Sequence, residues 1–89
     1  MRERWFGSTG RKVPEIALEG TIDLEGALVL EDASDVTRIR AAHLGGTPVV
    51  VRARSADAIL SALSRGEVSC VLVPDASLLE VDLAELTYG

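Results

Sequence analysis

The feature that most constrains the fold is the segment 48–74, in which two apolar runs flank an amphipathic stretch. The runs 49–51 and 68–73 have little polar alternation, which is typical of strands that are buried on both faces of a parallel sheet. Between them, apolar residues recur at i, i+3, i+4 and i+7 from Ala56, directly after Ser55, a residue type that commonly caps helices. The segment therefore predicts a strand–helix–strand unit.

A second unit of the same kind precedes it. An apolar strand is expected at 27–31, followed by a helix at 35–44 that Ser34 caps and that Gly45 and Gly46 end. The sequence thus predicts an α/β domain whose small sheet has three parallel strands, at 27–31, 48–52 and 68–73, linked by two helices.

Two further segments alternate apolar and polar residues. The segments 13–19 and 21–25 have the period of two that half-exposed strands show, with a turn at Gly20 between them. They predict an antiparallel N-terminal extension of the sheet. The tail 78–86 fits either a helix or a strand, because its leucines satisfy both periods.

Residues 1–12 differ from the rest of the chain in charge. They carry four basic residues and one acidic residue, so +3, which leaves 9 − 4 = 5 basic and 14 − 1 = 13 acidic residues, or −8, for 13–89. We expect a flexible or partner-binding arm at 1–12 and a single α/β domain at 13–89. The two aromatic residues of the arm either pack on their own domain or insert into a partner. The candidate interface residues are Arg2, Arg4, Trp5 and Phe6.

Charged and polar residues follow the predicted parallel strands. Because ligands of open parallel sheets bind beyond the carboxyl ends of the strands, we treat these residues as a candidate ligand site. In one interpretation the acids and arginines simply form ion pairs; in the other, the arginines and a helix N-terminus bind a small ligand or a phosphate. The candidate residues are Asp32, Arg52, Arg54, Ser55 and Asp75. Two carboxylates are too few to specify a metal site, so neither a metal nor a cofactor is expected.

A catalytic set is not apparent in the sequence. His43 is the only histidine, and Cys70, the only cysteine, lies inside an apolar run where a buried, inert thiol is expected. We therefore predict no catalytic residues and no enzymatic activity of the chain alone, and a role as a non-catalytic subunit of an enzyme complex stays open.

The sequence also suggests a cellular context. It has neither a signal-peptide pattern nor an apolar run of about 18 residues, so a cytoplasmic protein without membrane association is expected. The acidic body argues against a broad nucleic-acid surface, and only the basic arm is suited to contact RNA. The expected partner is another protein subunit or a second copy of the chain.

The region from Val49 to Leu83 reads as strand, helix and strand, followed by the acidic–apolar run Leu79-Glu80-Val81-Asp82-Leu83-Ala84. In this order it resembles the p30-type protein subunit of archaeal and eukaryotic ribonuclease P. The resemblance implies a non-catalytic subunit of an RNA-processing ribonucleoprotein that pairs with another protein. The leading hypothesis is accordingly a protein-interaction subunit of a larger complex, and the alternative is a small-ligand or anion-binding regulatory domain.

Overall fold

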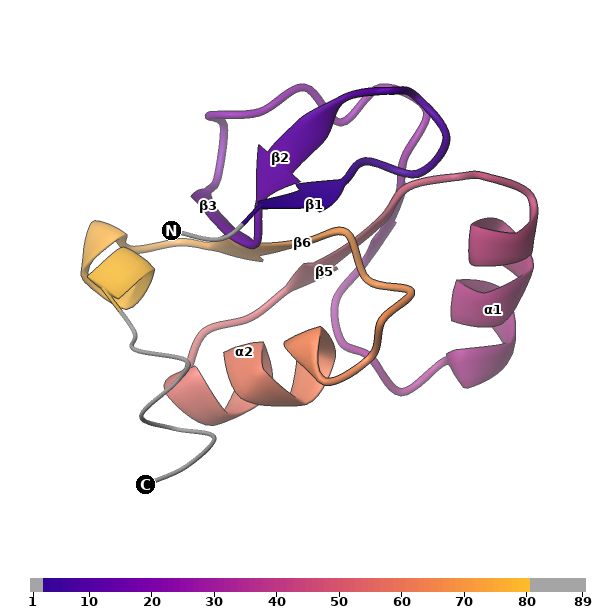
Figure 1. Cartoon of the computed structure of the whole chain (residues 1–89). Helices are drawn as coiled ribbons and strands as arrows, with labels where there is room; N and C mark the ends of the chain where they lie inside the picture. Colours follow the sequence, from indigo (N-terminus) through magenta and orange to yellow (C-terminus); the bar gives the residue numbers. More distant parts are fainter. Residues whose placement is uncertain (1–2, 81–89) are drawn as a thin grey trace.

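A four-stranded parallel sheet, in the order β3-β6-β5-β4, lies at the centre of the protein (Figure 1). The structure is a computed structural model, and it describes residues 3–80. In chain order the elements are β1 (Glu3–Trp5), β2 (Lys12–Pro14), β3 (Ile16–Leu18), β4 (Leu28–Leu30), α1 (Val36–Leu44), β5 (Val49–Arg52), α2 (Ala56–Leu63), β6 (Cys70–Val73) and the 3-10 helix η1 (Ala76–Glu80).

The predicted α/β class is confirmed, with its parallel strands linked by two helices. The strands β4, β5 and β6 fall within the three predicted apolar runs, and they pair in parallel. The side chain of Ser55 accepts the N–H of Ala58, as expected of the residue that caps α2. The cap predicted for α1 is one residue early: the carboxylate of Asp35, and not Ser34, accepts the N–H of Arg38.

The two faces of the sheet are covered by different parts of the chain. Both helices lie on one face, where Ile39 of α1 and Ile59 of α2 pack on the apolar side chains of the strands (Figure 1). The opposite face carries the β1–β2 hairpin, whose Phe6 and Val13 pack on Val50 and on the other inward side chains of that face. Every strand of the sheet is therefore sandwiched, which explains the uninterrupted apolar runs.

The antiparallel N-terminal element is also confirmed, but it involves other residues than predicted. It is formed by β1 and β2, in which Trp5 pairs with Lys12. The segment 16–18 instead becomes β3, which pairs in parallel with β6 at one edge of the sheet. The segment 21–25 forms no strand.

The physical reason lies in the connection between β3 and β4. These two strands occupy opposite edges of the sheet, so the residues between them must cross one of its faces. Ile22 and Leu24 pack on the face that also holds the hairpin. Their alternation therefore reflects an irregular segment that lies across the sheet with one side buried.

Residues 3–12, which the sequence predicts as part of an arm, form the β1–β2 hairpin and its turn. The turn is closed by a hydrogen bond from the N–H of Phe6 to the carbonyl of Arg11, at 2.7 Å. Residues 1 and 2 and the tail from 81 onward lie outside the described residues, and within 76–80 the tail begins as η1. Within residues 3–80, neither helix has the length and apolar character needed to cross a bilayer.

Candidate functional site

Three of the five predicted strand-end residues line a cavity at the carboxyl edge of the sheet. This carboxyl-edge cavity has a volume of about 350 Å³, and Asp32, Arg52 and Arg54 line it together with Glu31. Ser55 and Asp75 are not among its lining residues within the described chain. The carboxylate of Asp75 accepts the N–H of Ser77 and so shapes the start of η1.

Arg52 is engaged by two carboxylates. Its Nε lies 2.6 Å from Oε1 of Glu19, and its Nη1 lies 3.0 Å from Oε1 of Glu31. The hydrogen bond to Glu19 and then the one to Glu31 raise the pKa of the Arg52 guanidinium above its usual value. The ion-pair interpretation of this edge therefore holds for Arg52.

The remaining charges of this cavity balance. Asp32 accepts the hydroxyl and the N–H of Ser34, and these two bonds lower the pKa of its carboxyl group. Arg54 forms no ion pair within residues 3–80. Two carboxylates and two guanidinium groups line the cavity, and Glu19 adds a third carboxylate beside Arg52. Among the described residues of this cavity there is thus no excess of positive charge of the kind that favours phosphate binding.

The hairpin is fixed at the opposite, amino edge of the sheet by Arg4. Its Nη2 donates to the carbonyl of Leu63 at 2.9 Å, and its Nη1 donates to the carbonyl of Val68 at 2.9 Å and to that of Arg65 at 3.3 Å. Its Nε lies 3.0 Å from Oε1 of Glu15, a carboxylate residue that is only 5% exposed. The cation thus satisfies the carbonyls at the C-terminus of α2 and neutralises a buried charge at the same time.

Neighbouring residues of the hairpin strengthen this attachment. Phe6 is fully buried. Gly7 has a φ of +57°, and a Cβ there would lie 2.5 Å from the carbonyl oxygen of Gly46. The next residue, Ser8, donates its N–H to the same oxygen at 2.9 Å. Only glycine permits this close approach of the hairpin to the turn between α1 and β5.

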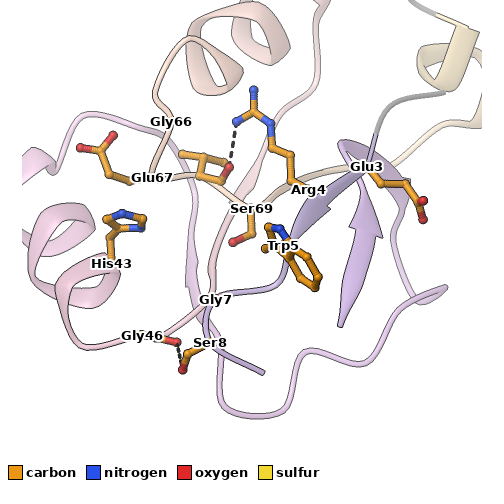
Figure 2. A pocket seen from close by; sticks show the side chains of 11 residues that line it. Glu3, Arg4, Trp5, Gly7, Ser8, His43, Gly46, Gly66, Glu67 and Ser69 are labelled. Carbon is orange, nitrogen blue, oxygen red and sulfur yellow. Dashed lines mark hydrogen bonds between the residues drawn. The ribbon is translucent and has the colours of Figure 1, made fainter. Parts of the chain in front are cut away.

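Trp5, between these anchors, remains outside the core. Its side chain is 60% exposed, because adjacent residues of an extended chain point to opposite sides and Phe6 takes the inward direction. The indole borders an open cavity of about 630 Å³, here called the hairpin groove (Figure 2). Its walls come from the hairpin, the end of α1 and the turn before β6, and they include Glu3, Trp5, Ser8, His43, Glu67 and Ser69.

Within the described residues, the single cysteine and the single histidine lie in different surroundings. Burial raises the pKa of the Cys70 thiol to about 12, so this sulfur is a poor nucleophile in the folded protein. His43 is exposed in the last turn of α1 and lines the hairpin groove. Within residues 3–80, no group of three His, Cys, Asp or Glu side chains is placed to hold a metal ion.

Comparisons with models of protein families, with curated proteins and with solved structures find no match. The resemblance to the p30-type subunit of ribonuclease P therefore stays a prediction that rests on the sequence pattern alone.

The hairpin groove contains two acidic residues and a serine that were not predicted as site residues. Glu3 and Glu67 look like ordinary surface acids in the sequence, and Ser69 interrupts an apolar run. All three precede or lie outside the carboxyl ends of the strands, where the rule for parallel sheets directs attention. Of the predicted interface residues, Trp5 lines the groove, Arg4 lines it while bonded to the body of the protein, Phe6 lies in the core, and Arg2 lies outside the described residues.

Proposed function

We propose that this chain is a non-catalytic protein-interaction domain that uses the hairpin groove to contact a partner. The observation that carries the proposal is Trp5, a large aromatic side chain that is 60% exposed, while its neighbours Arg4 and Phe6 are bonded to or buried in the body of the protein. Tryptophan is among the residues that most often dominate binding energy at protein interfaces. A hairpin that is attached on both sides of Trp5 limits the positions of the indole before binding, which reduces the entropy lost in the complex.

The other basic residues of the hairpin already have contacts within the protein. Arg4 bonds to carbonyls of the body of the protein, the guanidinium of Arg11 lies 4.6 Å from the ring centroid of Phe6, and the ammonium of Lys12 lies 4.9 Å from that of Trp5. These contacts support a protein partner more than RNA, since phosphate binding needs free cations. An RNA-processing role stays a prediction based on the sequence resemblance.

The test is quantitative affinity capture with the wild-type chain, with Trp5→Ser and with Leu44→Ser as a matched control. Leu44 is also a large exposed apolar residue, but it does not line the groove. We expect a specific set of proteins that is retained by Leu44→Ser and lost by Trp5→Ser. Light scattering of the same three proteins detects a second copy as the partner.

The proposal fails if Trp5→Ser retains every captured protein and has the same oligomeric state as the wild type. The alternative, an anion-binding domain, is tested separately by calorimetric titration with inorganic phosphate. Saturable binding that Arg54→Ala abolishes, while Trp5→Ser leaves it intact, would favour the carboxyl-edge cavity over the hairpin groove.

A further inference from the structure

We propose that the hairpin groove binds an extended basic segment of a partner protein, with a lysine or arginine side chain held against Trp5 and by Glu67. This inference rests on the proposed function and specifies the chemistry of the partner. It is carried by three independent features of the groove: the hydroxyl of a nearly buried serine that has no hydrogen-bond partner in the described residues, unpaired carboxylates, and an aromatic surface.

The hydroxyl belongs to Ser69, which lines the groove. This residue is only 6% exposed, yet its hydroxyl has no hydrogen-bond partner within residues 3–80, while its backbone N–H is used by the carbonyl of Val49 at 2.8 Å. Ser69 lines the groove, and Figure 2 shows its oxygen in the space between Trp5 and His43. Because this oxygen faces the groove and has no bond within the described residues, it can donate a hydrogen bond to a bound segment or accept one from it.

The carboxylates of the groove favour a positively charged ligand. Glu3 and Glu67 line the groove and form no ion pair within the described chain. The only arginine or lysine of the lining is Arg4, and its guanidinium is already engaged by Glu15 and by three backbone carbonyls. The groove therefore attracts cations, in a chain whose formal net charge is −5.

The aromatic surface favours a cation of a particular kind. The ammonium of Lys12 lies 4.9 Å from the centroid of the Trp5 ring, which is the distance of a cation–π contact. Lys12 does not line the groove, whereas Trp5 does, so the indole also presents surface toward the groove. A lysine or arginine side chain can combine an apolar stem along this surface with a charged end at a carboxylate.

The arrangement suits an extended segment better than a single small ion. Figure 2 shows Glu67 and His43 on one side of Trp5, and Glu3 on the other. The volume of about 630 Å³ lies within the range of roughly 300–1,000 Å³ that is usual for ligand sites. A chain with basic residues at alternating positions could meet both carboxylates while it crosses the indole.

The experiment measures fluorescence anisotropy with a labelled decapeptide that carries lysine or arginine at alternate positions. Two control peptides of the same length have glutamine or glutamate at those positions. The proteins are the full chain, Trp5→Leu, Glu67→Gln and Glu25→Gln. Glu25 is an exposed acid outside the groove, so its variant removes the same charge from another place. Circular dichroism verifies that each variant is folded.

We expect only the basic peptide to bind. Its affinity should fall as the salt concentration is raised from about 50 to about 300 mM, because salt screens the attraction between exposed charges. Trp5→Leu and Glu67→Gln should each weaken binding about fivefold or more, and Glu25→Gln less than about twofold. If one groove variant does not fold, the other decides. Equal loss in Glu25→Gln and Glu67→Gln, or equal binding of the glutamine peptide, overturns the inference.

The two proposals can fail separately. If Trp5→Ser loses captured partners but the basic peptide does not bind, the interaction domain stands and the basic partner is wrong. If Trp5→Ser changes neither capture nor oligomeric state, the proposed function itself fails.

Discussion

Replacement of Arg4 tests how the hairpin is held to the rest of the protein. The Arg4→Met variant keeps the apolar stem but removes a cation that bonds to Glu15 and to carbonyls at Leu63, Arg65 and Val68. Removing one partner of a buried ion pair typically costs about 3–5 kcal/mol, because the other charge stays buried without compensation. The side chain of Arg4 is 25% exposed, so solvent partly screens the pair. We therefore expect a loss of unfolding free energy at the low end of this range, about 3 kcal/mol.

A loss of this size is readily measured. For a domain of this length, 1 kcal/mol corresponds to roughly 4–8 °C in melting temperature, so Arg4→Met should melt about 12–24 °C below the wild type. Urea denaturation followed by circular dichroism gives the free energy of unfolding directly. Arg4→Lys retains a charge near Glu15 but cannot reach three carbonyls in the same geometry, so an intermediate loss is expected.

A double-mutant cycle separates the charge from the other contacts. If the buried charge of Glu15 causes most of the loss, Arg4→Met combined with Glu15→Gln should be about 1–2 kcal/mol more stable than the sum of the single effects predicts. The reasoning is refuted if Arg4→Met unfolds within about 0.5 kcal/mol of the wild type, or if the two substitutions are additive.

Three other predictions follow from local geometry. Gly7→Ala should lower the free energy of unfolding by about 3 kcal/mol, because its Cβ would lie 2.5 Å from a backbone carbonyl oxygen. Gly10→Ala is also at positive φ but in open space, and it should cost only about 1 kcal/mol. Equal melting temperatures of the two variants would contradict this. Cys70, with its pKa raised to about 12, should react with thiol reagents at pH 8 only after unfolding, and rapid native labelling would show that the thiol is accessible. The folded-state pKa of Asp32 is lowered, so its bonds to Ser34 stabilise the protein above the unfolded pKa of 3.8, and this contribution decreases as pH falls through the folded value. Ser34→Ala should therefore lower the melting temperature more at pH 7 than at pH 2, and an equal loss at both would contradict this.

The sequence predicts the part of the fold that depends on neighbouring residues. The strands β4, β5 and β6 and both helices are encoded by continuous apolar runs and by local caps such as Ser55. The pairing of β3 cannot be predicted in this way, because its partner β6 lies far along the chain. A short alternating segment is also compatible with both parallel and antiparallel pairing. The hairpin was missed for a similar reason: its β1 strand carries the polar pattern of an exposed tail.

The candidate site was only partly predictable. Asp32, Arg52 and Arg54 do meet at one cavity, as the direction of parallel strands requires. Glu19 contacts Arg52 at this edge because β3 runs parallel to the other strands. The alternating pattern of the β3 segment does not predict this direction. The exposure of Trp5 follows from the direction that Phe6 takes into the core, and that direction depends on the hairpin rather than on composition.

The placement of β3 beside β6 has a consequence for the order of folding. Val71 donates its N–H to the carbonyl of Glu15, and Arg4 reaches the carbonyl of Val68 across 64 positions of the chain. During synthesis from the N-terminus, Arg4 and β3 therefore emerge long before β6 and the turn that precedes it, to which they bind. Closing loops of this length slows folding, since their entropy is lost before the contacts form. We expect β4, α1 and β5 to assemble first, and the arrival of β6 to bring both ends of the domain into a single cooperative unit.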